Sequence, residues 1–125
     1  MEALIDTSFL MLMAEKGRNI ISMIEDKLND CLEPIILKSV IDELVKLSKQ
    51  KGKRALYAKT ALKISLGMKI IDAGIDASTD EQLVKLSKNT NLLVVTSDFE
   101  MSRKLRETGC RYIYVNRVGK IHLNL

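Results

Sequence analysis

Short apolar runs of strand length recur along the chain, and the segments between them place their apolar residues at helical spacing. The runs are "ALI" after Met1, "PIIL" after Glu33, "KII" after Met68, "LLVVT" after Asn91 and "YIYV" after Arg111. Strands that alternate with helices predict parallel crossover connections. The pattern therefore predicts an α/β fold, a three-layer α/β/α sandwich with a buried, mainly parallel central sheet.

Two helices are expected between the second and third strands. They fall around "VIDELVKLSKQ" and "RALYAKTALKISLG", with "KQKGK" as an exposed turn. The final residues, "KIHLNL", alternate between apolar and polar and predict a short edge strand after the turn at Gly119. Because the chain has 125 residues, no linker, no internal repeat and no low-complexity segment, we expect a single domain over residues 1–125.

Composition narrows the class of protein only a little. The formal net charge of +4 points weakly to a polyanionic partner such as nucleic acid. Cys31 and Cys110 form no metal-binding or redox pair, so we expect reduced thiols. The apolar stretches are far shorter than the ~20 residues that cross a bilayer. We therefore expect a cytoplasmic protein that makes no membrane contact.

Acidic residues follow the strands. Asp6 and Asp98 each end an apolar run directly before a predicted helix. The carboxyl ends of parallel strands lie along one edge of a sheet, so these two side chains should be near neighbours. Asp80 falls in the first turn of the helix after "IIDAGID", and Glu43 lies one turn into the helix that begins at "KSVIDELVKL". Both residues should reach the same edge.

Helix capping is the plainer explanation for each carboxylate taken alone. Serine residues at capping-box spacing offer an alternative set of caps. Ser39, with Asp42 three residues later, Ser78 before Glu81, and Ser97 before Glu100 would cap the three helices. This assignment leaves Glu43, Asp80 and Asp98 free for another role.

Four carboxylates in one crevice repel each other unless a cation neutralises them. Oxygen ligands without His or Cys suit Mg²⁺ or Mn²⁺, which can activate water and support displacement at phosphorus. Basic residues near this edge would hold the flanking phosphates of a nucleic-acid strand that the metal cleaves, although a solvated helix face explains them equally well. These residues are Lys51, Lys53, Arg54, Arg103, Lys104 and Arg106.

The motifs together resemble the PIN domain, a compact metal-dependent ribonuclease fold. The similar segments are "LIDTSFLM", "SVIDELVKL", "STDEQLVKLS" and "VVTSDFEMSRKLRE", in the expected order and across essentially the entire chain. The resemblance implies Asp6, Glu43, Asp80 and Asp98 as catalytic metal ligands. It also implies supporting roles for Ser8, Thr96 and Ser97.

Within that family, the C-terminal segment is most similar to single-domain archaeal proteins that resemble the ribosomal-RNA-processing PIN nuclease. The VapC-like toxin branch is also similar, which would imply an antitoxin partner. Lys38 and Glu81 depart from residues common in close relatives, and neither is an expected ligand. The family resemblance favours a homodimer.

Two functions follow from these observations. The first is a metal-dependent endoribonuclease in which an activated water attacks the phosphodiester and Asp98 or Asp80 orients it. The alternative is an RNA-binding or ribosome-assembly module with little turnover. A phosphoacceptor signalling domain or an Asp-nucleophile phosphatase fits less well, because Ser8 stands where the phosphatase motif needs a second Asp and Asn116 where the signalling domain needs Lys.

Three other features have interpretations outside the proposed site. His122 is expected to be a surface or packing residue. Tyr112 and Tyr114 share one face of a strand, where stacking on bases and burial against a helix are both open and burial is favoured. The helix containing Met11 and Met13 is apolar enough for either a homodimer seam or a core position.

Overall fold

The computed structural model describes residues 1–125 and contains a six-stranded sheet. The strands are β1 (Glu2–Ile5), β2 (Glu33–Leu37), β3 (Lys69–Ile71), β4 (Leu93–Thr96), β5 (Tyr112–Val115) and β6 (Ile121–Asn124). Their spatial order is β3-β2-β1-β4-β5-β6. The first five strands run parallel, and β6 pairs antiparallel with β5. The predicted mainly parallel sheet and its C-terminal edge strand are both confirmed.

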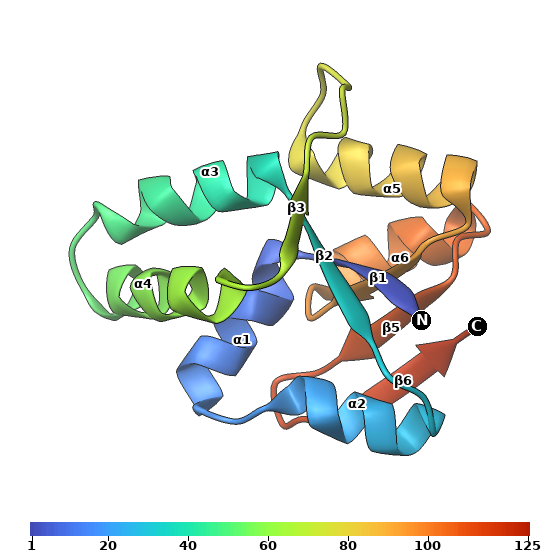
Figure 1. Ribbon diagram of the computed structural model, residues 1–125, viewed down its shortest axis with the longest axis horizontal. Coiled ribbons are helices and arrows are strands. Elements are labelled where there is room, and N and C mark those ends of the chain that lie inside the picture. Colours follow the sequence, from blue (N-terminus) through green and yellow to red (C-terminus); the bar gives the residue numbers. More distant parts are fainter.

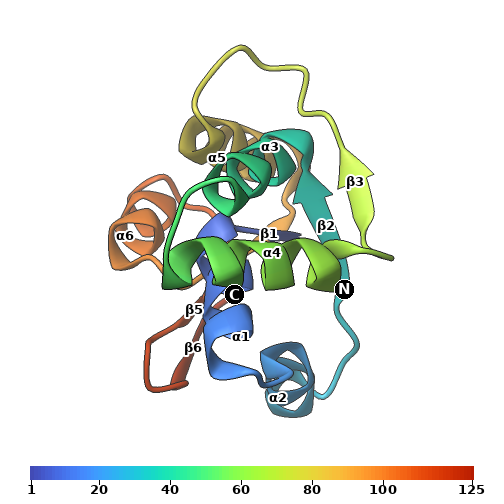
Figure 2. The same ribbon diagram turned by 90° about the vertical axis from the view of Figure 1, so that its left-hand side faces the viewer.

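Six helices flank the sheet and complete the three-layer α/β/α sandwich. They are α1 (Thr7–Lys16), α2 (Ile20–Leu28), α3 (Lys38–Ser48), α4 (Lys53–Ser65), α5 (Thr79–Thr90) and α6 (Phe99–Glu107). Figure 1 shows α5 and α6 on one side of the sheet and α2 on the other. The view in Figure 2 places α4 in front of the strands with α3 above it. The predicted pair of helices between the second and third strands is confirmed as α3 and α4.

The core explains why the strands read as continuous apolar runs. Both central strands are buried along almost their whole length, because helices cover the two faces of the sheet. The largest fully buried side chains include Phe9, Leu4, Ile36 and Leu93. The core is therefore contributed by the middle of the sheet and the helices packed on it.

One helix, α2, is not among the predicted elements. Gly17 ends α1 in a left-handed conformation with φ of 62°, which a residue with a Cβ atom adopts only at a cost. Asn19 then caps α2 by accepting a hydrogen bond from the backbone N–H of Ser22. The segment between the first two strands is therefore two helices with a sharp break.

Two further features concern the thiols and the lengths of the helices. Cys31 is exposed and Cys110 is buried, and both are free thiols. None of the helices combines the length and apolar character that crossing a membrane requires.

Candidate active site

The sheet order changes direction between β1 and β4. From β1 the chain adds β2 and β3 on one side, and it later adds β4 and β5 on the other. The connections therefore leave the carboxyl ends of β1 and β4 in opposite directions and open a crevice there, the usual ligand site of parallel α/β sheets. Asp6 follows β1 at this point, and its backbone N–H donates to the carbonyl of Val95 in β4 at 2.9 Å. Asp98 follows β4 two residues after the strand ends.

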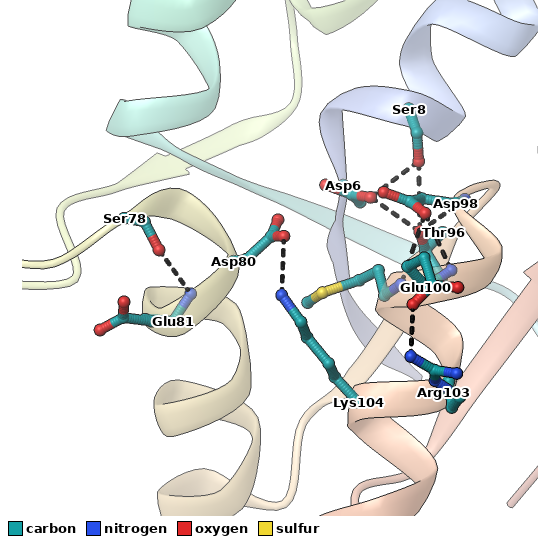
Figure 3. Close-up of polar contacts among 11 residues, drawn as sticks. Asp6, Ser8, Ser78, Asp80, Glu81, Thr96, Asp98, Glu100, Arg103 and Lys104 are labelled. Carbon is teal, nitrogen blue, oxygen red and sulfur yellow. Dashed lines mark hydrogen bonds and ion pairs between the residues drawn. The ribbon is translucent and has the colours of Figure 1, made fainter.

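Hydroxyl groups from two segments hold the Asp6 carboxylate in place. Thr96 Oγ1 and Ser8 Oγ each donate a hydrogen bond of 2.7 Å to Oδ2 of Asp6. The same two hydroxyls also accept backbone N–H groups at 3.0 Å, Ser8 from Ser97 and Thr96 from Asp98. Figure 3 shows the resulting network between the start of α1 and the turn after β4.

Burial makes the charge on Asp6 unfavourable. Its side chain sits at the bottom of the crevice with only 5% of the residue exposed. Burial raises the pKa of Asp6 above the ordinary range, the hydrogen bonds from Thr96 and Ser8 oppose the rise, and the negative charges of Asp80 and Asp98 add to it. Asp80 and Asp98 thus both lie within electrostatic reach of the Asp6 carboxylate.

Asp98 is the N-cap of α6, which corrects the assignment of that cap to Ser97. Its Oδ1 accepts hydrogen bonds from the backbone N–H groups of Glu100 at 2.9 Å and Met101 at 3.4 Å. The Ser97 hydroxyl is instead buried without a hydrogen-bond partner. Asp98 is thus both a cap and a residue of the crevice, and one role does not exclude the other because a carboxylate has two oxygens.

Asp80 reaches the crevice from α5, and the predicted cap beside it is confirmed. Ser78 caps α5 by accepting from the backbone N–H of Glu81 at 3.3 Å. The Asp80 side chain is therefore free to form an ion pair with Lys104 of α6, with 3.6 Å between Nζ and Oδ2. Figure 3 shows Lys104 extending from α6 toward Asp80 on the neighbouring helix.

Glu43 lies on α3, whose N-cap stands two residues before the predicted Ser39. The N-cap is Leu37, which has no capping side chain, and Ser39 is already helical. The Ser39 hydroxyl donates to the side chain of Gln82 in α5 at 3.0 Å, so it links two helices instead of capping one. Glu43 accepts a hydrogen bond of 3.0 Å on Oε2 from Thr7 at the start of α1.

All four predicted acidic residues line one cleft of about 480 Å³. In each carboxylate one oxygen has a partner within the protein and the other has none. The oxygens without a hydrogen bond or ion pair are Oδ1 of Asp6, Oε1 of Glu43, Oδ1 of Asp80 and Oδ2 of Asp98. The side chains stand apart, and no three His, Cys, Asp or Glu residues are grouped closely enough to hold a metal ion. Because like charges repel, a bound cation would have to draw these side chains together.

Of the predicted basic residues, Arg54 lines the cleft. Lys104 does not line the cleft but pairs with Asp80, which does. Arg103 forms ion pairs along α6, with Glu100 at 2.6 Å and Glu107 at 3.9 Å. The other three are exposed side chains, namely Lys51, Lys53 and Arg106. The structure thus brings one of the six into the cleft itself.

Sequence reasoning missed several residues of the cleft, of which Arg117, Glu15 and Tyr57 are the most polar. Arg117 follows β5 and forms an ion pair of 2.7 Å with Glu15 at the end of α1. No local pattern reveals this pair, since the two residues are 102 positions apart. Thr7 gave a better signal because it stands between Asp6 and Ser8 in the "IDTS" segment.

The remaining predictions concern three aromatic residues and the methionines of α1. Tyr112 is buried and Tyr114 half-buried, which confirms that packing decides their position. His122 is exposed on β6, as expected. Met13 is a core residue, whereas Met11 is half-buried and lines the cleft.

Comparison with known proteins identifies the family of this chain. Residues 3–117 match the family described as PIN like domain. The chain is 30% identical over 115 residues to Ribonuclease VapC4 of Methanocaldococcus jannaschii, a match that covers 90% of this chain and 88% of that protein. The chain therefore belongs to the PIN-domain nuclease family.

Solved structures show the same fold. The PIN domain endonuclease Utp24 has a TM-score of 0.79 and 23% identity, and the match covers 99% of this chain and 92% of that one. VapBC2 from Rickettsia felis, solved with a DNA fragment from its promoter, has a TM-score of 0.62 and 15% identity, with 82% of this chain and 92% of that one covered. These likenesses confirm the PIN-like α/β architecture.

Proposed function

We propose that the protein is a metal-dependent endoribonuclease that hydrolyses RNA phosphodiester bonds in the acidic cleft. Asp6, Glu43, Asp80 and Asp98 would hold Mg²⁺ or Mn²⁺. The observation that carries the proposal is the arrangement of their oxygens: one oxygen of each carboxylate is held by the protein, and the other is free in the same cleft.

The residues fit a hard divalent cation. Every candidate ligand is a carboxylate, which suits Mg²⁺ and Mn²⁺ better than zinc or copper. The pKa of Asp6 is raised first by burial and then by the negative charges of Asp80 and Asp98, an unfavourable arrangement that a bound cation would relieve. When bound, a cation of this kind supplies an activated water and stabilises the charge that develops on phosphorus.

Residues of the chain would perform the other steps. Thr96 and Ser8 fix the orientation of the Asp6 carboxylate through two hydrogen bonds to one oxygen. Asp98 or Asp80 would orient the attacking water and accept its proton. Arg54 and Arg117 line the cleft and offer positive charge to the phosphates on either side of the cleaved bond.

The surrounding basic side chains would extend this track along the RNA backbone. Lys51 and Lys53 lie near Arg54, at the turn before α4 and at its first residue, while Arg103, Lys104 and Arg106 lie on α6. Contacts of this kind are electrostatic, so affinity should fall steeply as salt concentration rises.

RNA cleavage with matched variants tests the proposal. A labelled, partly structured RNA is incubated with Mg²⁺, Mn²⁺ or EDTA and with wild type, Asp6→Asn or Asp98→Asn. Each substitution keeps the shape of the side chain and removes its charge. We expect metal-dependent cutting by the wild type and its loss in both variants. In EDTA, each variant should melt at about the temperature of the wild type or above it. Binding without cutting under every metal would instead support an RNA-binding or ribosome-assembly module.

Two biological roles fit such an enzyme. A toxin role with a small antitoxin partner would suit the likeness to Ribonuclease VapC4 and to VapBC2, and an RNA-processing role would suit the likeness to the endonuclease Utp24. A neighbouring gene for a small DNA-binding antitoxin, and co-purification of its product, would favour the first role. We also propose a homodimer, which the sedimentation coefficient of the purified protein tests.

A further inference from the structure

A phenylalanine stands unusually exposed beside the acidic cleft. The chain has only two Phe, three Tyr and no Trp, so aromatic side chains are scarce. Phe99 is 58% exposed although it directly follows Asp98 and begins α6. Most of a Phe side chain is usually buried, because its exposure leaves apolar surface in water.

Phe99 is one end of a row of three rings. It packs edge-on against Tyr114, with ring centroids 5.9 Å apart and an angle of 74° between the planes. Tyr114 stacks on His122 at 5.8 Å and 30°. We call Phe99, Tyr114 and His122 the aromatic row. Its two outer members are exposed, while the central tyrosine is half-buried.

Strand register connects this row to the candidate catalytic aspartate. Tyr114 is the partner of Thr96 across the β4–β5 pair and of His122 across the β5–β6 pair. Paired residues in neighbouring strands place their side chains on the same face of a sheet. Thr96 in turn donates to Asp6. A single line across the sheet therefore runs from Asp6 through Thr96 to the aromatic row.

We propose that the aromatic row is a stacking site for an unpaired base of the RNA strand, next to the bond that is cut. This inference rests on the proposed function, because it assumes RNA in the acidic cleft. Aromatic rings bind single-stranded nucleic acid by stacking on base faces, whatever the base. Phe99 directly follows Asp98, which lines the cleft, so a strand held in the cleft would pass close to the row.

The charge next to the row suits a nucleic acid as its occupant. Arg103 lies four residues after Phe99 on α6, hence on the same face of the helix. Its side chain is half exposed and pairs with Glu100 at 2.6 Å and Glu107 at 3.9 Å, exposed ion pairs that a phosphate could replace at little cost. A guanidinium beside an exposed ring provides a phosphate contact and a base contact together, which an apolar protein partner would not need.

Binding of single-stranded RNA without cleavage tests the inference. A fluorescein-labelled unstructured RNA oligonucleotide is titrated in EDTA with wild type, Phe99→Ala, Phe99→Trp and Leu66→Ala. Leu66 is a matched control, since it is 78% exposed and precedes β3 at the opposite edge of the sheet. We expect Phe99→Ala to weaken binding by roughly 5- to 100-fold, the range for loss of one stacked base. Phe99→Trp should bind like wild type, and Leu66→Ala should stay within about twofold of it.

A duplex of the same sequence and a 2-aminopurine base in the single strand distinguish stacking from charge. The duplex should bind all four proteins alike, because its bases are not available to stack. Wild type should quench the 2-aminopurine fluorescence, and Phe99→Ala should not. The inference is overturned if Phe99→Ala binds like Leu66→Ala, if duplex binding falls equally, or if wild type does not bind the single strand.

The binding and cleavage results separate this inference from the nuclease proposal. If wild type binds through Phe99 yet cuts no RNA with any metal, the nuclease proposal fails and the stacking site stands. If wild type cuts RNA and Phe99→Ala has the same KM and affinity, the stacking site fails and the nuclease stands.

Discussion

Thr96 donates a hydrogen bond of 2.7 Å from its hydroxyl to Oδ2 of Asp6, across the junction between β4 and β1. The Thr96 hydroxyl oxygen in turn accepts a hydrogen bond of 3.0 Å from the backbone N–H of Asp98. A single buried hydroxyl therefore fixes the positions of two candidate metal ligands. The other oxygen of Asp6 is left without a protein partner, which is the arrangement a metal ligand requires.

Thr96→Val should destabilise the protein in the absence of metal. Valine keeps the shape of threonine but leaves the Asp6 carboxylate and the Asp98 N–H without that partner, at a cost of about 1–3 kcal/mol in the free energy of unfolding. Urea unfolding in EDTA at neutral pH measures this change. Thr60→Val, an exposed threonine on α4, is the control and should change the free energy by less than about 0.5 kcal/mol. Equal effects of the two substitutions would contradict the role of the buried hydroxyl.

Asp6→Asn should stabilise the metal-free protein at neutral pH. Burial raises the pKa of Asp6 in the folded state above the ordinary value of 3.8. The contribution of Asp6 to stability is therefore fully present below that value and is lost as pH rises through the raised pKa. In EDTA, Asp6→Asn should melt above wild type at pH 7, and the difference should narrow as pH falls toward 3.8. If Asp6→Asn melts below wild type at pH 7, the negative charge of Asp6 does not destabilise the folded protein.

Asp98 substitutions should separate capping from activity. Asp98→Asn retains an oxygen that can cap α6, so its stability should stay within a few tenths of a kcal/mol of wild type while cleavage is lost. Ser78→Ala removes the cap of α5 and should cost about 1 kcal/mol without loss of cleavage. Thermal melts in EDTA and cleavage rates at equal protein concentration provide the two readouts. Loss of cleavage in Ser78→Ala, or its retention in Asp98→Asn, would contradict this division.

The strand ends explain why the acidic residues could be predicted. Parallel strands have to place Asp6 and Asp98 on one edge of the sheet, and the apolar runs before them identify the strands without ambiguity. The cap of α6 could not be decided in the same way, since Ser97 and Asp98 are adjacent and both suit the position. Tertiary structure decided it: the Ser97 N–H binds Ser8, and the Ser97 hydroxyl is buried.

Contacts between residues far apart in the chain could not be predicted from the sequence. Arg117 enters the cleft because the chain after β5 lies beside the end of α1, where Glu15 pairs with it. The link between Ser39 and Gln82 likewise depends on how α3 packs against α5. Neither contact leaves a local spacing pattern, so only the folded chain reveals them.

Lys104→Gln should increase the affinity of the protein for Mn²⁺. The Lys104 ammonium pairs with Asp80 at 3.6 Å, and an ammonium there competes with a divalent cation for the carboxylate. Both side chains are about half exposed, so we expect a gain of at most roughly fivefold and little change in the melting temperature. Calorimetric titration of Mn²⁺ measures the affinity, with Lys85→Gln, an exposed lysine of α5, as the control. Equal affinities for wild type and Lys104→Gln would show that the ammonium does not compete.

We propose that RNA is cut by a metal held on four specific carboxylates, and that the acidity of this surface in general does not suffice. Each of two ligands has an acidic neighbour as a matched control: Asp42 beside Glu43, and Glu81 beside Asp80. The decisive measurement is the single-turnover rate of RNA cleavage in Mn²⁺ for Glu43→Gln, Asp42→Asn, Asp80→Asn and Glu81→Gln. Loss of a ligand should lower the rate by roughly 100-fold or more, equivalent to several kcal/mol of transition-state stabilisation, while each neighbour stays within about twofold of wild type. Equal rates within each pair, or a wild type that never cuts RNA, would contradict the account.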